Sequence, residues 1–99
     1  LIGGWAQFAP QAYTQVTDQV MNRLESKDLI IIAGDTLPPQ TKAFREGRSH
    51  VQVGQRPFEM GYRAPDVMIQ LINGEKVDDP LFTGLDVCTA DEPGFCENN

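Results

Sequence analysis

Apolar and polar positions along the chain follow two different spacings, which predict strands and helices in turn. Residues 29–35 form an almost continuous run rich in isoleucine, which is typical of a central parallel strand covered on both faces. Residues 49–55 alternate polar and apolar side chains, which indicates a strand nearer the edge of a sheet. A short apolar segment at residues 1–4 predicts a further strand at the beginning.

The segments between these strands carry the spacing of amphipathic helices. Between residues 10 and 28, apolar side chains recur every three or four positions, at Tyr13, Val16, Val20 and Leu24. Residues 37–46 predict a second helix that Gly47 ends. Residues 57–73 predict a third, in which Pro65 forces either a kink or a new helix start. Its apolar stripe consists of Met60, Ala64, Val67, Met68, Leu71 and Ile72.

The alternation of strands and helices predicts an α/β fold of the doubly wound type, with parallel strands joined by right-handed crossovers. The chain opens with Leu1-Ile2-Gly3-Gly4-Trp5, without an initiator Met or a signal peptide. Because this opening lies inside an expected strand, we predict that the chain is an incomplete piece of a longer protein.

Composition and charge limit the classes of protein to which the chain can belong. The chain is 40% hydrophobic and 22% charged, as globular proteins are. Its longest apolar run, Leu29 to Ala33, is far shorter than the ~20 residues that span a bilayer. Eight basic residues against fourteen acidic ones give a net charge of −6, which disfavours binding to nucleic acid.

Three polar or aromatic side chains directly follow a glycine at the predicted strand ends: Trp5, Asp35 and Gln55. Ligands of open parallel sheets bind beyond the carboxyl ends of the strands, so we expect these residues to line one site. A carboxylate accepts two hydroxyl protons, an amide donates and accepts, and an indole gives a flat apolar wall. This set predicts a neutral, polyhydroxylated ligand. The alternatives are that Asp35 caps the next helix, that Gln55 is a satisfied loop amide, and that Trp5 is core.

Blocks of sequence, in order, carry a resemblance to a known family. They resemble the carboxyl-terminal part of type I periplasmic sugar-binding proteins, the ribose-binding-protein-like family that serves ATP-driven importers. The three main blocks are Ile31-Ile32-Ala33-Gly34-Asp35-Thr36-Leu37-Pro38, Ala43-Phe44-Arg45-Glu46-Gly47 and Val53-Gly54-Gln55-Arg56-Pro57-Phe58-Glu59-Met60-Gly61-Tyr62. Residues 72–77 and 83–87 continue the pattern.

The resemblance implies two α/β lobes that close on a monosaccharide or related polyol, with a membrane permease of an ABC importer as partner. It implies that Asp35 and Gln55 contact the sugar, whereas Trp5 stands where the family often places a polar contact. It also implies a division into a partial lobe (1–57), a helix that crosses to the other lobe (58–80), and a final extended segment with a polar tail (81–99). The implied location is the periplasm, with no catalysis, cofactor, metal or nucleic acid.

Export to an oxidising compartment favours a disulfide between Cys88 and Cys96, which flank a Pro93-Gly94 turn. The alternative is a pair of unrelated reduced thiols. His50 is the only histidine, and its place at a strand entry favours a structural role. One histidine and two cysteines lack the spacing of a metal site, and the sequence contains no phosphate-binding glycine loop.

Two other functions stay open. The fold is shared by the effector-binding domains of lac-repressor-type regulators, which an upstream helix-turn-helix would indicate. An α/β enzyme fragment that uses Asp35 would need a base or nucleophile that the sequence does not offer. We also predict self-association, because strand edges and the apolar stripe at residues 60–72 lack partners within the chain.

Overall fold

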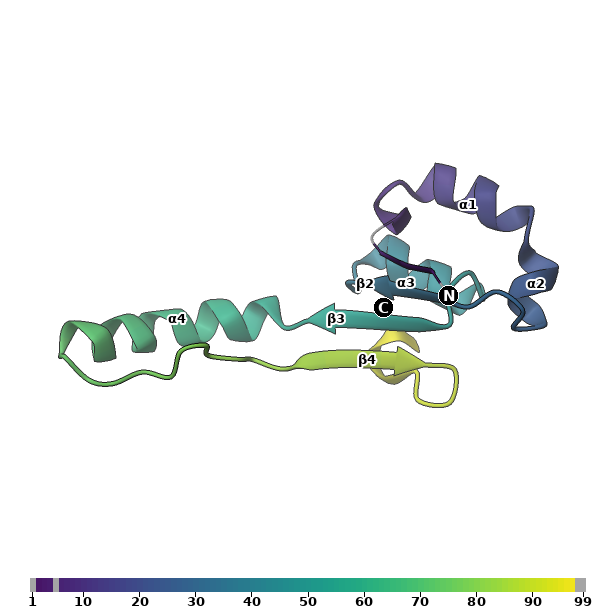
Figure 1. Ribbon diagram of the computed structural model, residues 1–99. Coiled ribbons are helices and arrows are strands. Elements are labelled where there is room, and N and C mark those ends of the chain that lie inside the picture. Colours follow the sequence, from purple (N-terminus) through teal and green to yellow (C-terminus); the bar gives the residue numbers. More distant parts are fainter. Residues whose placement is uncertain (1, 5, 98–99) are drawn as a thin grey trace. The chain divides into compact units, whose positions relative to one another are not determined.

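The computed structural model describes residues 2–4 and 6–97, in four strands, four α-helices and two 3₁₀ turns. The strands are β1 (Ile2–Gly4), β2 (Ile31–Gly34), β3 (Val51–Gln55) and β4 (Leu85–Thr89). The helices are α1 (Pro10–Asp18), α2 (Met21–Glu25), α3 (Pro38–Arg45) and α4 (Pro57–Ile72), and the 3₁₀ turns are η1 (Ala6–Phe8) and η2 (Gly94–Glu97). Figure 1 shows the order of these elements along the chain.

The chain divides into two compact units, which we describe separately. The sheet unit contains the described residues up to Gly54 and those from Asp86 onward. The α4 unit consists of Gln55–Leu85 and contains the longest helix.

The sheet has the strand order β1-β2-β3-β4. The first three strands are parallel, with Gly4 opposite Ala33 in one pair and Gly34 opposite Val53 in the next. β4 runs in the opposite direction beside β3 (Figure 1). The predicted α/β fold with parallel strands joined through helices is therefore confirmed.

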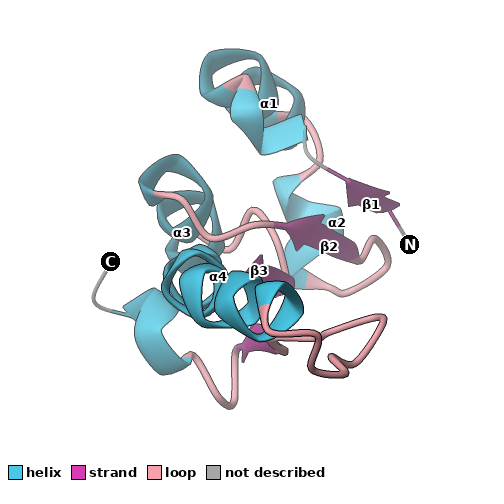
Figure 2. Ribbon diagram, turned by 90° about the vertical axis from the view of Figure 1, so that its left-hand side faces the viewer, coloured by secondary structure: helices cyan, strands magenta, loops and turns pink. Residues whose placement is uncertain are grey.

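One face of the sheet is covered more completely than the other. Along β2, Ile31 and Ala33 are buried whereas Ile32 is only half-buried, so coverage of both faces, as the isoleucine run predicted, is not found in this chain. Figure 2 shows α1 and α3 on the same side of the sheet. The apolar core consists of Tyr13, Leu24, Ile31 and Ala43, and Val20, Met21 and Leu29 pack against it.

The predicted helix over residues 10–28 is two helices, because the chain leaves helical geometry at Val20, whose φ is −128°. The Thr17 hydroxyl donates to the Tyr13 carbonyl oxygen at 2.8 Å, a local bond that competes with the helix ladder. Arg48 places its guanidinium at this helix end, donating to the Thr14 carbonyl at 3.3 Å and to Asp18 Oδ1 at 2.7 Å. A cation at this position stabilises the carboxyl end of α1.

In the α4 unit, α4 continues through Pro65, so the alternative of a new helix start at that residue is wrong. Pro57 occupies its first turn, where a missing N–H costs nothing. None of its described side chains is buried. No helix among the described residues is long and apolar enough to cross a membrane.

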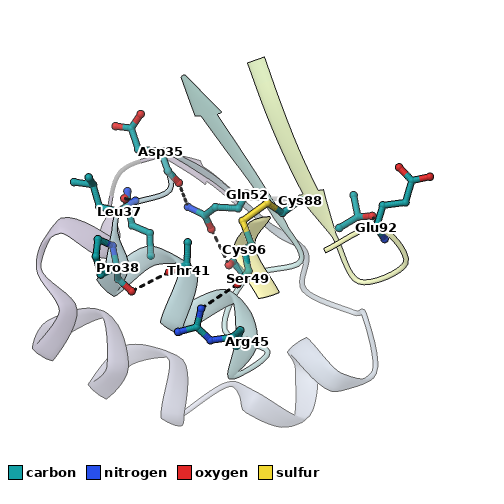
Figure 3. Close-up of a disulfide and its surroundings, with 12 residues drawn as sticks. Asp35, Leu37, Pro38, Thr41, Arg45, Ser49, Gln52, Cys88, Glu92 and Cys96 are labelled. Carbon is teal, nitrogen blue, oxygen red and sulfur yellow. Dashed lines mark hydrogen bonds between the residues drawn. A yellow bond between two sulfur atoms is a disulfide. The ribbon is translucent and has the colours of Figure 1, made fainter. Parts of the chain in front are cut away.

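A disulfide lies within the sheet unit, between β4 and η2. Cys88 of β4 and Cys96 of η2 are joined in a disulfide with an S–S distance of 2.05 Å, and both are fully buried (Figure 3). Arg45 of α3 donates from Nη1 to the Cys96 carbonyl oxygen at 3.0 Å. The disulfide thus joins η2 to β4, and the Arg45 hydrogen bond joins η2 to α3.

Candidate functional site

Asp35, which directly follows β2, has a φ of 69°, in the left-handed region that few residues other than glycine adopt. Two hydrogen bonds hold it there. Its N–H donates to the Val53 carbonyl oxygen of β3 at 2.7 Å, and its own carbonyl oxygen accepts from Gln52 Nε2 at 2.5 Å. Such conformations persist where the surroundings over-determine them, often at ligand sites.

The carboxylate of Asp35 has no hydrogen-bond donor among the described residues. Figure 3 shows it pointing away from Gln52, while the backbone carbonyl of Asp35 faces that amide. The alternative that Asp35 caps the next helix is wrong, since the cap residue of α3 is Leu37. The Leu37 N–H is satisfied instead by Gln40 Oε1 at 2.7 Å. The half-buried Asp35 therefore has neither a helix-capping role nor a side-chain partner among the described residues.

The segment after Asp35 lies very close to β3. A Cβ atom added to Gly54 would lie 2.6 Å from Thr36 Oγ1 and 2.7 Å from Thr36 Cγ2. Real Cβ atoms do not approach so closely, so only glycine fits at this position of β3. The glycine therefore lets the Asp35-Thr36 segment pack directly on the neighbouring strand.

Beneath Asp35 lies a buried chain of polar side chains that the sequence pattern did not predict. Gln52 is fully buried and donates from Nε2 to Gln7 Oε1 at 2.9 Å as well as to the Asp35 carbonyl. Its Oε1 accepts from the Ser49 hydroxyl at 3.1 Å (Figure 3). This chain connects η1, β3 and the backbone at Asp35. We name these three side chains, Gln7, Gln52 and Ser49, the polar chain.

Gln55 is the last residue of β3 and belongs to the α4 unit. Its side chain is exposed, and no described residue forms a hydrogen bond with its amide, so the alternative of a satisfied loop amide is not observed. Within the α4 unit it lines a groove of about 640 Å³ together with Met60 and residues 81–85. Trp5, the third expected ligand contact, lies outside the described residues.

His50 has a structural role, as its sequence position indicated. Its Nδ1 accepts a hydrogen bond from the Ile31 N–H at 3.2 Å, which leaves Nε2 as the donor to the Leu24 carbonyl oxygen at 3.0 Å. Both ring nitrogens are thus used. Within the described part of the chain, no group of three or more His, Cys, Asp or Glu residues could hold a metal ion.

Tyr13 and Arg48 have perturbed ionisation. Burial raises the pKa of Tyr13 above its ordinary value of 10.0, although the nearby Gln7 amide and the Arg48 charge act in the opposite direction. The Tyr13 hydroxyl donates to the Arg48 carbonyl oxygen. Hydrogen bonds to Asp18 and Glu46 raise the pKa of Arg48. Neither side chain contacts Asp35. These two shifts in pKa therefore belong to the helices that pack on the sheet, and not to the strand end at Asp35.

A parallel sheet with free polar groups at its strand ends is the arrangement of open α/β folds that bind small ligands there. No family model and no curated protein sequence matches the chain. A solved structure does match: the crystal structure of GanP, a glucose-galactose binding protein from Geobacillus stearothermophilus. The TM-score is 0.63 with 28% sequence identity, over 81% of this chain and 29% of the GanP chain. The chain is thus similar to part of a sugar-binding protein and spans less than a third of its length.

Proposed function

We propose that the chain is part of a sugar-binding protein that holds a small polyhydroxylated ligand without transforming it. The observation that carries this proposal is the Asp35 carboxylate, which is held at a strand end in a left-handed conformation and has no donor among the described residues. The similarity to GanP supports the same ligand class. A carboxylate is suited to sugars because it accepts charge-assisted hydrogen bonds from two neighbouring hydroxyls.

The proposal assigns a different role to each expected ligand contact. Asp35 accepts hydroxyl protons, and the exposed Gln55 amide both donates and accepts. Trp5 supplies an apolar wall for the C–H face of the sugar ring. These assignments rest on the residue types and on their positions at the ends of successive parallel strands.

The wider setting belongs to the same proposal. The chain serves as the carboxyl-terminal part of a two-lobed binding protein, in which 1–57 contribute to one lobe, 58–80 reach the other, and 81–99 complete the chain. The intact protein closes on a monosaccharide and delivers it to the permease of an ATP-driven importer outside the cytoplasm. The joined cysteines are compatible with an oxidising compartment.

Calorimetric titration of the protein that carries this chain, with glucose, galactose and ribose, tests the proposal. Asp35→Asn keeps the side-chain shape but removes the charge, and we expect at least tenfold weaker binding, about 1.4 kcal/mol or more. Asp28→Asn is the matched control, because Asp28 is exposed and precedes β2 instead of following it. This control should bind as the parent does.

Two results would count against the proposal. Equal affinity of the Asp35→Asn and Asp28→Asn variants would remove Asp35 from the site. Conversion of the bound sugar, followed by NMR of the sugar signals over hours, would replace binding by catalysis. The 99-residue chain alone should bind these sugars more weakly than the intact protein does, since a two-lobed protein contributes contacts from both sides.

A further inference from the structure

Two buried glutamines hold the backbone around Asp35, and the proposed function gives no role to either of them. Gln52 of β3 is fully buried, and Gln40 of α3 is 1% exposed. Glutamine is mostly exposed in folded proteins, since burial of its amide costs free energy unless hydrogen bonds replace those to water. The burial of both side chains beside one strand end therefore needs a physical reason.

The amide of Gln52 is directed at the peptide group that follows the Asp35 Cα atom. Its Nε2 donates to the Asp35 carbonyl oxygen at 2.5 Å and lies 3.4 Å from the Gly34 carbonyl oxygen. The other members of the polar chain hold this amide in place. Nε2 also donates to Gln7 Oε1 at 2.9 Å, and Oε1 accepts from the Ser49 hydroxyl at 3.1 Å. Gln52 therefore contacts Asp35 with an amide whose orientation is fixed.

The amide of Gln40 binds both ends of the loop that contains Asp35. Its Nε2 donates at 2.7 Å to the Gly34 carbonyl oxygen, which belongs to the peptide group before the Asp35 Cα atom. Its Oε1 accepts from the Leu37 N–H, also at 2.7 Å. One side chain thus bridges residues 34 and 37, on either side of Asp35.

Together these hydrogen bonds hold both peptide groups that flank the Asp35 Cα atom. The group before it is bound by Gln40 at its oxygen and by the Val53 carbonyl at its N–H, and the group after it is bound by Gln52. The orientations of the two groups define φ and ψ, and with them the direction of the Cα–Cβ bond. The left-handed φ of 69° is thus held by bonds from α3 and β3, and only rotations within the side chain are left to the carboxylate.

We propose that Gln52 and Gln40 are positioning residues for ligand binding, which hold Asp35 in the backbone conformation from which its carboxylate contacts the sugar hydroxyls. This inference rests on the proposed function of Asp35. An apolar side chain would fill the same buried space without the cost of removing an amide from water. Buried hydrogen-bond networks make a structure rigid, and a binding group must be held to within about 0.5 Å of its productive position.

Affinity measured on folded protein separates positioning from stability. The protein that carries this chain is titrated by calorimetry with whichever of glucose, galactose and ribose binds the parent most tightly, at a temperature where circular dichroism shows each variant to be folded. We expect about tenfold weaker binding for Gln52→Leu and for Gln40→Leu, because a displaced carboxylate loses its paired contact with two hydroxyls. Leu24→Ala is the control. It lowers stability through the apolar core of the same unit and should bind as the parent does.

A double-mutant cycle tests whether Gln52 acts through Asp35. Asp35→Gly removes the carboxylate and keeps a residue that tolerates a positive φ. In this background Gln52→Leu should weaken binding by less than about twofold, because the contact that Gln52 positions is already lost. Ser49→Ala keeps the Gln52 donor but releases the other end of its amide. It should also weaken binding, by less than Gln52→Leu does, and it serves if Gln52→Leu fails to fold.

Three outcomes would overturn the positioning role and leave the proposed function standing. The first is weak binding by Asp35→Asn together with parent-like binding by Gln52→Leu, or by Ser49→Ala and Gln40→Leu where Gln52→Leu does not fold. The second is an equal loss of affinity in Leu24→Ala, which would show an effect of stability alone. The third is full additivity of Gln52→Leu with Asp35→Gly, which would show that Gln52 acts on another contact. Parent-like binding by Asp35→Asn would instead overturn the proposed function, and this inference with it.

Discussion

The sheet unit and the α4 unit differ in which side chains they cover. In the sheet unit most of the large, fully buried side chains are polar, among them Gln7, Gln40 and Gln52. In the α4 unit most of the large apolar side chains of α4 are exposed, with Leu71 59% and Ile72 80% accessible. α3, half as long as α4, buries three residues, whereas α4 buries none.

The difference shows that an apolar stripe predicts a helix but not its burial. The stripe of α4 has the spacing of a packed helix, yet none of its residues is buried. In the sheet unit, polar residues are buried because each finds a hydrogen-bond partner, which removes most of the cost of leaving water. Paired substitutions, one in each unit, test how far this contrast extends.

Leucine truncation should give the largest effect. Leu24 is 1% exposed, so Leu24→Ala should lower the free energy of unfolding by about 3 kcal/mol through lost burial and a residual cavity. Leu71→Ala removes the same atoms from an exposed site and should change the free energy of unfolding by less than about 0.5 kcal/mol. Urea denaturation followed by circular dichroism measures both. An equal loss at Leu71 would show that α4 is covered in solution.

Replacement of a buried glutamine should give the second-largest loss in the free energy of unfolding. Gln52→Leu leaves the Asp35 carbonyl, Gln7 Oε1 and the Ser49 hydroxyl without their partner, so we expect a loss of about 2–3 kcal/mol. Gln70→Leu on α4 is exposed and should be nearly neutral. The same denaturation experiment measures both. A neutral Gln52→Leu variant would mean that the polar chain adds nothing to stability.

Glycine replacement should have opposite signs in the two units. Gly54→Ala forces Cβ against Thr36 and should destabilise by about 1–2 kcal/mol. Gly61→Ala on α4 meets no atom within 4 Å and should stabilise by about 0.5–1 kcal/mol through helix propensity. Thr36→Ala should restore most of the loss in the Gly54→Ala background, as a double-mutant cycle would show. Independent effects of the two changes would contradict the close approach.

Alkaline pH should give the smallest change in the free energy of unfolding, and this change should come from Tyr13 of the sheet unit. Burial raises the pKa of Tyr13, so above pH 10 the unfolded state loses the proton that the folded state keeps. The stability contributed by this group is complete below pH 10 and is lost as pH rises through the folded pKa. The slope of stability against pH should be shallower in Tyr13→Phe. Identical slopes from pH 9 to 11 would exclude a shifted Tyr13.

Local patterns predicted the first three strands, their parallel arrangement and the helical segments between them, because spacing and glycine positions depend directly on backbone geometry. They did not predict that β4 runs in the opposite direction. The break between α1 and α2 could not be seen in this way. At this break Arg48, which is distant in sequence, forms hydrogen bonds with the end of α1. A local pattern contains no information about such a contact.

The alternation in residues 49–55 correctly predicted a strand, but its expected place nearer the edge of the sheet is wrong, because β3 lies between β2 and β4. The buried side of this strand is also the polar one. Gln52 and Gly54 are buried while Val51 and Val53 are half-buried. Hydrophobicity predicts the reverse, since it counts a glutamine as a surface residue whatever its partners. The position of Asp35 at a strand end could be predicted from the Gly34-Asp35 pair. The hydrogen bond between Gln7 and Gln52 could not, because the two residues are far apart in the sequence.

Asp35 has a backbone conformation that is unfavourable for an aspartate, although its side chain is proposed to bind the ligand. Glycine adopts a φ of 69° without the steric cost that an aspartate bears, so Asp35→Gly should fold at least as well as the parent. The same change would delete the one carboxylate proposed to hold the ligand. Selection of variants for heat resistance alone would therefore tend to discard this aspartate, and a gain in thermal tolerance at position 35 would signal a trade-off with activity.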